Sequence, residues 1–292
     1  MTYPDEQGTL PVPGGRVWWR RIGDGPGTPL LLLHGGPGAS SAGLADWLGD
    51  LPDTRPVVVY DQLGSGRSDR PDDPSLWTLD RFVEELGVVR AGLGLDTVNL
   101  LGHSWGTMLA ASYLATGVQG VRSVVFSSPC LDARQWATDQ QAHLAKLPAD
   151  VREVIERCER EGTTASEDYT MAMAAYYRRH LVRLDPWPDE VAEMLQDINL
   201  DVYGLMWGSS EWNATGTLGD FDARGILPTI DAPTLFLAGE HDEALPETVR
   251  AHAGLVPDST VHVFDGASHL SYIEVPEDYR RVVGGFLDER GL

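Results

Sequence analysis

The chain has 292 residues, 42% of them hydrophobic, and carries a formal net charge of −22 at pH 7. This length and apolar content suit one large α/β domain, or a domain with an insertion, that buries a sizeable core. The strong negative charge disfavours binding to nucleic acid and to anionic membrane surfaces, because both repel an acidic protein.

Short aliphatic segments that end in polar or glycine-rich turns recur along the chain, and each is predicted to be a strand followed by a loop. These segments lie at 16–22, 29–38, 56–69, 98–106, 121–129, 232–242 and 259–269. Helices are predicted at 107–115 and 276–290. The alternation predicts an α/β fold with a mostly parallel, doubly wound sheet covered by helices on both faces. In such sheets ligands bind at the carboxyl ends of the strands.

The segment from 131 to 228 breaks this rhythm, because it is rich in Ala, Glu, Arg and Leu and contains no strong strand. Its length exceeds that of ordinary connections between elements. We expect a helical cap at 131–228 over a core made of 1–130 and 229–292. The alternative is an ordinary pair of crossover helices.

The sequence GHSWG at 102–106 fits the pattern G-x-S-x-G and lies between a predicted strand and a predicted helix. A sharp strand-to-helix turn of this kind lifts a serine above the sheet. A side chain at Gly102 or Gly106 would collide with the adjoining backbone of the turn. We therefore predict that Ser104 is a catalytic nucleophile.

A serine hydroxyl needs a base, and the base needs an acid that orients it. In this fold the acid and the histidine follow the serine in that order along the chain. Asp242 and His269 each follow one of the last two predicted strands, so they are the predicted acid and base.

The other histidines are weaker candidates for the base. His34 and His103 lie inside glycine turns that position them, and His241 is expected to point away from Asp242. The remaining histidines have no matching location: His143, His180, His252 and His262. No pair of histidines has metal-ligand spacing, so we predict no metal.

The glycine-rich turn HGGPG at 34–38 is predicted to supply half of an oxyanion hole. A tetrahedral intermediate carries a negatively charged oxygen, which two backbone N–H groups can stabilise. We assign these donors to Gly36 and Trp105, because glycine lets the backbone approach a substrate closely. The alternative is a tight turn without a chemical role.

Taken together, the sequence resembles the proline iminopeptidase family of α/β-hydrolases, close to the tricorn-interacting aminopeptidase and amino-acid amidases. The resemblance rests on HGGPG, YDQLGSGRSD, GHSWG, GEHDE and GASHL, which occur in order over nearly the whole chain outside the cap. It implies a serine aminopeptidase that releases an N-terminal residue, often proline, from a small peptide, or acts on an amino-acid amide. It also implies that no cofactor is used.

The resemblance further implies that glutamates hold the free α-amine of the substrate. Glu243, directly after Asp242, and Glu211, in the cap, match the glutamates of the family. An exopeptidase must recognise an ammonium group, and carboxylates in a poorly hydrated pocket do this best. Gly35 is a further candidate for substrate binding, whereas Glu240 and Glu247 are expected to face solvent.

Other positions bear on specificity. Leu63 stands where proline-specific members of the family often have arginine. Trp105 is the expected wall of the side-chain pocket. Most of the aromatic residues of the cap are expected to pack within it: Tyr176, Tyr177, Trp187, Tyr203 and Trp207.

Two readings outside this one remain open. The same residues could act on an ester, an amide or a biosynthetic intermediate, or the fold could serve as a binding module without turnover. The two cysteines, Cys130 and Cys158, form no CxxC motif, and the N-terminal 15 residues have no apolar core. We therefore expect a cytoplasmic protein without a signal peptide or a membrane segment, and the oligomeric state stays open.

Overall fold

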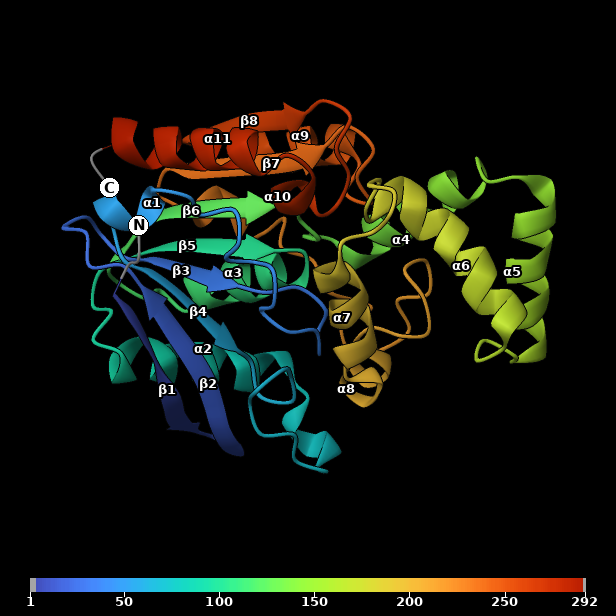
Figure 1. The fold of residues 1–292 in the computed structure, drawn as a ribbon, viewed down its shortest axis with the longest axis horizontal. Helices are drawn as coiled ribbons and strands as arrows, with labels where there is room; N and C mark the ends of the chain where they lie inside the picture. Colours follow the sequence, from blue (N-terminus) through green and yellow to red (C-terminus); the bar gives the residue numbers. More distant parts are fainter. Residues whose placement is uncertain (1–3, 291–292) are drawn as a thin grey trace.

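The computed structural model describes residues 4–290 and contains one eight-stranded sheet (Figure 1). Its strand order is β1-β2-β4-β3-β5-β6-β7-β8. The strands are β1 (Asp5–Val12), β2 (Gly15–Ile22), β3 (Leu30–Leu33), β4 (Val57–Asp61), β5 (Val98–His103), β6 (Val121–Ser127), β7 (Thr234–Gly239) and β8 (Ser259–Phe264). All seven predicted strands are confirmed, and the strands from β3 to β8 run parallel.

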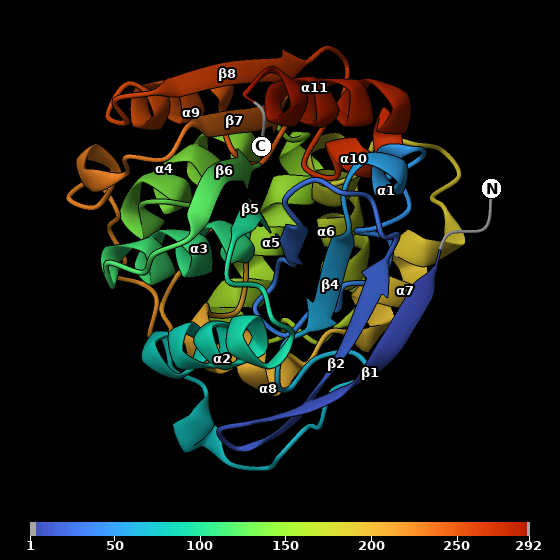
Figure 2. The same cartoon turned by 90° about the vertical axis from the view of Figure 1, so that its left-hand side faces the viewer.

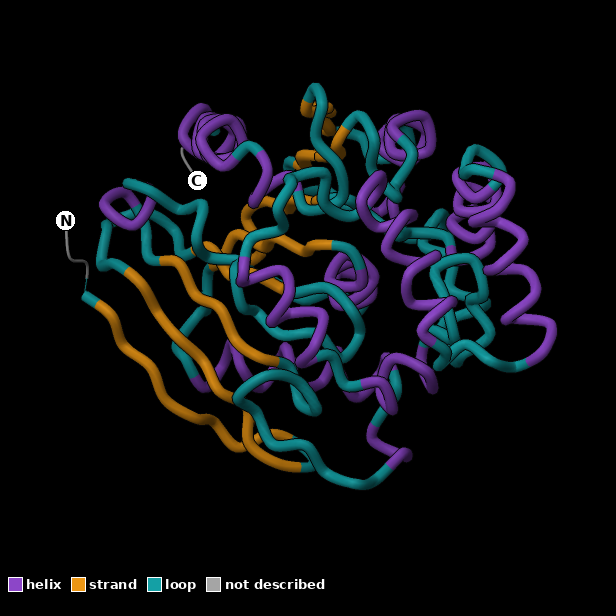
Figure 3. Tube along the Cα trace, turned by 45° about the vertical axis from the view of Figure 1, so that its right-hand side comes forward, coloured by secondary structure: helices purple, strands orange, loops and turns teal. Residues whose placement is uncertain are grey.

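The first two strands run antiparallel and form a hairpin at one edge of the sheet (Figure 3). The edge strand β1 was not predicted. Its sequence, DEQGTLPV, contains two acids, a glycine and a proline, and its residues are exposed or half-buried. Such a composition is typical of a protected edge strand and gives no apolar signal.

Helices cover both faces of the sheet, as expected for a doubly wound fold (Figure 2). Helices α2 (Leu79–Gly92), α3 (Trp105–Ala115) and α9 (Pro246–Ala253) lie on one face. Helices α1 (Leu51–Thr54), α10 (Ser271–Glu274) and α11 (Pro276–Glu289) lie on the other. Two short 3₁₀ helices complete the core region, η1 (Pro74–Leu76) and η2 (Leu227–Thr229).

The chain between β6 and β7 is helical, as predicted, and extends beyond the carboxyl ends of the strands (Figure 1). It forms α4 (Ala133–Leu144), α5 (Ala149–Glu161), α6 (Glu167–His180), α7 (Asp189–Asp197) and α8 (Leu200–Met206). Helices α5 and α6 share a small apolar cluster that includes Ile155, Met173 and Tyr176. The limits of the cap at 131 and 228 stay a prediction.

The order of the strands brings two predicted motifs together. From β3 the chain turns to β4 on one side, and β5 pairs with β3 on the other, with Leu33 opposite Gly102. The turns that follow β3 and β5 therefore lie side by side, at the switch point where parallel sheets bind ligands. Within residues 4–290, none of the helices combines the length and apolar character needed to cross a bilayer.

Candidate active site

Ser104 lies on a sharp turn between β5 and α3, with φ 53° and ψ −120°. Small neighbours make this turn possible, as predicted. A Cβ on Gly106 would lie 2.2 Å from the carbonyl oxygen of Leu33, and one on Gly102 would lie 2.4 Å from the carbonyl oxygen of Gly106. Backbone strain of this kind persists only where the surrounding structure enforces it, and it is concentrated at functional sites.

Asp242 and His269 form a hydrogen-bonded pair beside Ser104. His269 Nδ1 lies 2.8 Å from Asp242 Oδ1, and both side chains are buried. Asp242 also accepts hydrogen bonds from the amides of Gly239 and Ala244, each at 2.9 Å. A carboxylate held by so many donors keeps its charge and fixes the orientation of the imidazole.

The second nitrogen of His269 faces a different carboxylate. Nε2 lies 3.6 Å from Glu243 Oε2, and no hydrogen bond joins it to Ser104 Oγ among the described residues. Ser104, Glu243 and His269 nevertheless line one cavity. In serine hydrolases this contact often tightens only when substrate is bound.

The carboxylates around His269 control its protonation. Burial favours the neutral imidazole, but Glu243, Asp242 and Glu211 outweigh that effect and raise the pKa of His269 to about 9. Burial, followed by the charge of Glu211, raises the pKa of Glu243 to about 8. Burial likewise raises the pKa of Glu211, whereas His269 holds the pKa of Asp242 low against the effect of burial.

These shifts predict a pH profile. His269 is a base only when neutral, so hydrolysis of a neutral ester such as p-nitrophenyl acetate should rise with pH, with a midpoint in kcat/KM near 9. Replacing Glu243 by Gln removes one negative charge beside the imidazolium and should lower the midpoint by about one pH unit. Stopped assays from pH 6 to 10 on both proteins measure this. Equal midpoints near 6.5 would contradict it.

The turn after β3 places Gly35 and Gly36 against Ser104. Gly36 has φ 110°, and a Cβ on it would lie 2.7 Å from the amide of Ala39. A Cβ on Gly35 would lie 3.2 Å from Ser104 Cβ. Among the described residues, the amide of Gly36, in the turn after β3, and the amide of Trp105, at the start of α3, donate no hydrogen bond outside that turn or that helix. Both residues line a narrow cavity beside Ser104, here called the slot. They can therefore serve as donors to an oxyanion.

Glu211 and Glu243 both line the cavity that contains Ser104. Glu243 is 3% exposed, and its Oε1 has no hydrogen-bond partner. Glu211 is half-buried, and its Oε1 accepts a hydrogen bond of 2.5 Å from Tyr203. Buried carboxylate oxygens without partners are costly, and a cation that binds them relieves that cost.

Most other histidines and glutamates lie as expected. His34 and His103 are buried and bonded to backbone groups of the turns, at 3.0 Å to the Gln62 amide and 3.0 Å to the His269 carbonyl. His241 is half exposed and faces Glu240. Glu240 and Glu247 are exposed, as predicted.

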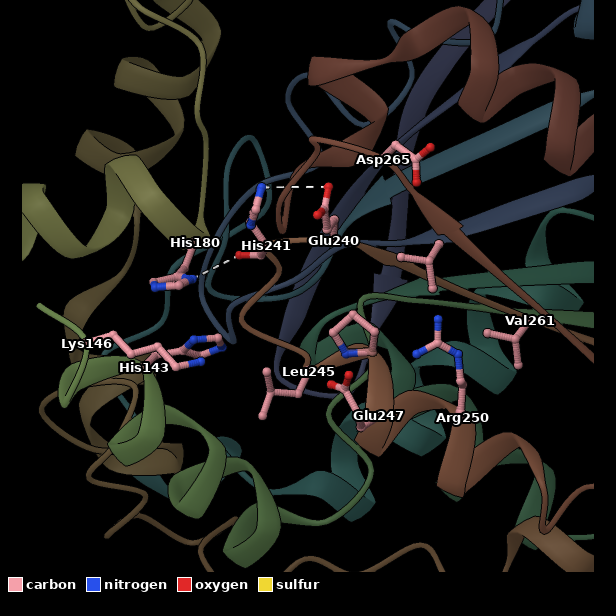
Figure 4. Close-up of a pocket in the computed structure, with 12 residues that line it drawn as sticks. His143, Lys146, His180, Glu240, His241, Leu245, Glu247, Arg250, Val261 and Asp265 are labelled. Atoms are coloured by element: carbon pink, nitrogen blue, oxygen red, sulfur yellow. Dashed lines mark hydrogen bonds and ion pairs between the residues drawn. The ribbon is translucent and has the colours of Figure 1, made fainter.

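His180 has a supporting position that the sequence did not reveal. It ends α6, and its carbonyl oxygen accepts the amide of His269 at 2.9 Å. Its Nδ1 lies 2.9 Å from the carbonyl oxygen of His241, and a dashed line in Figure 4 marks this contact. One residue of the cap thus contacts the loops that carry Asp242 and His269. Figure 4 shows residues that line a separate cavity of about 900 Å³, which is distinct from the candidate site because neither Ser104 nor His269 lines it.

Replacing His180 by Ala should lower kcat about 5- to 20-fold with little change in KM, because the loop of Asp242 loses its contact with His180 Nδ1 while the backbone contact with His269 remains. His180→Gln keeps a donor and should recover part of the loss. His252→Ala, which removes a similarly buried histidine on α9, serves as the matched control in steady-state assays. An equal loss in both alanine variants would show a general effect on stability instead.

Ser128 is a second residue that sequence reasoning missed. It follows β6 with φ 48°, and its hydroxyl donates to Asp242 Oδ2 at 2.7 Å. The available signal was a polar residue at the carboxyl end of a strand next to β7.

Two cavities meet at Ser104, Gly36 and Glu211. One is a narrow slot of about 10 Å³ free volume, which is about the space of one water. Its walls include Trp105, Trp136 and Trp207; that Trp105 is a wall of the side-chain pocket stays a prediction. The other, here called the chamber, has a volume of about 700 Å³.

The aromatic residues of the cap correct one expectation. Tyr177, Trp187 and Tyr203 line the chamber, and Trp207 lines the slot, so most of the five do more than pack within the cap. Leu63 lines neither cavity. It is buried, with its amide 3.3 Å from the carboxylate of Glu85.

Comparisons with known proteins agree with this geometry. Residues 28–276 match the family model described as the alpha/beta hydrolase fold. The chain is 48% identical over 284 residues to a proline iminopeptidase of Heyndrickxia coagulans, covering 97% of this chain and 98% of that one. The crystal structure of the proline iminopeptidase of Mycobacterium smegmatis superposes with a TM-score of 0.89 at 35% identity, covering 98% and 99% of the two chains. That of VinJ superposes with a TM-score of 0.93 at 36% identity, covering 97% and 98%.

Proposed function

Because the chain belongs to the proline iminopeptidase family of α/β-hydrolases, we propose how its residues carry out the reaction of that family. The protein is a serine aminopeptidase that releases an N-terminal proline. The substrate is a small peptide or an amino-acid amide. Segment 131–228 acts as a cap over the site, and the reaction needs no cofactor.

The observation that carries this proposal is the pair of glutamates beside the nucleophile. Glu243 is buried with one carboxylate oxygen unpartnered, and Glu211 lines the same cavity. Hydrolysis of an ordinary ester requires no pair of acids beside the nucleophile, and here the charge of Glu211 adds to burial in raising the pKa of Glu243. A protein that binds a free ammonium does, because charge-assisted hydrogen bonds to an ammonium stabilise both carboxylates.

In the first half of the reaction, Ser104 Oγ attacks the carbonyl carbon of the first residue and passes its proton to His269 Nε2. The amides of Gly36 and Trp105 hold the oxyanion. Since Glu243 faces Nε2 in this structure, an ammonium bound at Glu243 also frees Nε2 for Ser104.

In the second half, Nε2 returns the proton to the departing amine, and an acyl-enzyme remains on Ser104. His269 then activates a water, which releases the free residue. The slot beside Trp105 receives the ring of that residue, and its walls must move apart to admit it. A small or cyclic first residue fits best for this reason.

A cytoplasmic location is part of the proposal. It is supported by the two cysteines, which are both free and buried.

A panel of p-nitroanilides of Pro, Ala, Leu and Phe tests the proposal, with Ser104→Ala as the blank. Cleavage of the Pro or Ala anilide is expected, with Leu and Phe slower. If every anilide is inert while simple esters or amino-acid amides react, the protein is a specialised amidase or esterase.

A further inference from the structure

The two cavities at Ser104 bind different halves of the substrate, provided that the proposed function holds. His269 Nε2 hands its proton to the departing amine, so the leaving group must lie on the His269 side of Ser104. His269 lines the chamber and does not line the slot. The acyl half therefore lies near the slot, and the leaving group lies in the chamber.

The chamber is large and mostly apolar. Its volume of about 700 Å³ falls in the range of about 300–1,000 Å³ that holds a whole small-molecule ligand. Its walls are aliphatic and aromatic side chains of the cap, among them Met173, Tyr177, Leu181, Trp187, Leu195 and Ile198. Leu200, which is 70% exposed, also lines it.

The chamber offers no free cation to a carboxylate. Among the described residues, no lysine or arginine lines it, and the imidazole of His269 already faces Asp242 and Glu243. The C-terminal carboxylate of a dipeptide would therefore lose water there without gaining a cationic partner. An uncharged apolar group avoids this penalty.

We propose that the leaving group of this enzyme is an apolar, uncharged amine that fills the chamber, and that free dipeptides are poor substrates. A hydrophobic residue whose carboxyl group is amidated or continues into a longer peptide fits this description, as does a lipophilic amine. The apolar walls of the chamber thus select on the second half of the substrate, whereas Glu211 and Glu243, at its Ser104 end, bind the α-amine of the first half.

Four substrates with the same N-terminal proline test this: Pro-Leu-NH₂, Pro-Gly-NH₂, Pro-Leu-OH and proline hexylamide, with free proline measured by mass spectrometry. The kcat/KM of Pro-Leu-NH₂ should exceed that of Pro-Leu-OH by about 10- to 100-fold and that of Pro-Gly-NH₂ by about 10-fold. A hexylamide as fast as Pro-Leu-NH₂ supports the proposal with a lipophilic amine as the source. A slower hexylamide also supports the proposal, with a peptide as the source of the leaving group, provided that Pro-Leu-NH₂ has the highest kcat/KM of the four substrates.

A cation placed in the chamber provides a second test, in which variants are compared with the original protein on the same two substrates. Leu200→Arg should raise the ratio of kcat/KM for Pro-Leu-OH over Pro-Leu-NH₂ by about 2- to 5-fold, as expected for a partly exposed ion pair. Leu205→Arg is the matched control. It lies on the same helix, is 40% exposed and does not line the chamber, so it should leave the ratio unchanged.

The results distinguish a failure of the inference about the chamber from a failure of the proposed function. Rates on Pro-Leu-OH equal to or above those on Pro-Leu-NH₂, or equal rates on the Gly and Leu amides, overturn the inference about the chamber and leave the aminopeptidase standing. An equal change of the ratio in both arginine variants also overturns it. If none of the four substrates and no proline anilide releases proline, the proposed function itself fails.

Discussion

Replacing Ser104 by Ala is expected to lower kcat for proline p-nitroanilide by about 10⁴-fold or more, while the protein stays folded. The hydroxyl is the attacking atom, and no neighbouring side chain in the site can replace it. His34 and His103 are bonded to backbone groups, and Glu211 and Glu243 bind the α-amine in the proposed mechanism. Thermal unfolding followed by circular dichroism checks the fold alongside the kinetics.

Ser128→Ala is the matched control for this variant. Ser128 is also a serine at a strand end with positive φ, but its hydroxyl supports Asp242 and does not line either cavity. It should lose about 5- to 50-fold in kcat, as expected for one hydrogen bond to a charged group. If Ser104→Ala kept more than a few per cent of the activity, or lost no more than Ser128→Ala, Ser104 would not be the nucleophile.

The second large effect is expected when a glutamate that binds the α-amine of the substrate is replaced. Glu243→Gln should lower kcat/KM for proline p-nitroanilide by about 30- to 5,000-fold, because removing one partner of a buried ammonium–carboxylate pair costs about 2 to 5 kcal/mol. Glu211→Gln should lose less, about 10- to 100-fold, since Glu211 is only half-buried and solvent screens it. Gln keeps the shape of Glu in both variants.

A loss that is confined to the anilide substrate distinguishes amine binding from support of the triad. At the high-pH plateau, hydrolysis of p-nitrophenyl acetate has no amine to bind and should change by less than about 3-fold in either variant. Glu240→Gln, an exposed neighbour on the same loop, should be silent on both substrates. If anilide and ester activities fell together, the glutamates would be supporting the triad and not the amine.

Much of this site follows from the sequence because strand ends are predictable. Strands buried on both faces are continuous aliphatic runs, such as β3 and β4, and in a parallel sheet the residues that follow them meet at one edge. That reasoning is enough to bring Ser104, Asp242 and His269 together. It fails for β1, whose edge position requires no apolar pattern.

The remaining features depend on distances between segments that sequence alone does not relate. Ser128 and Asp242 are 114 residues apart, and nothing local to either predicts their hydrogen bond. The contacts of His180 with both catalytic loops depend on where α6 ends over the sheet. The approach of Glu243 Oε2 to His269 Nε2 depends on how the loop after β7 turns, and this contact sets the expected pH profile. The slot and the chamber are likewise products of the packing of the cap on the core.

The central claim is that this hydrolase recognises a free α-amine, and one measurement tests it most directly. Initial rates are compared on proline p-nitroanilide and N-acetylproline p-nitroanilide, which differ only in whether an ammonium is present. We expect kcat/KM to fall by about 10³-fold or more on acetylation, because the ammonium is lost and the acetyl group is forced against Glu211 and Glu243. Comparable rates on the two anilides would contradict the account, and the two glutamates would then need another explanation.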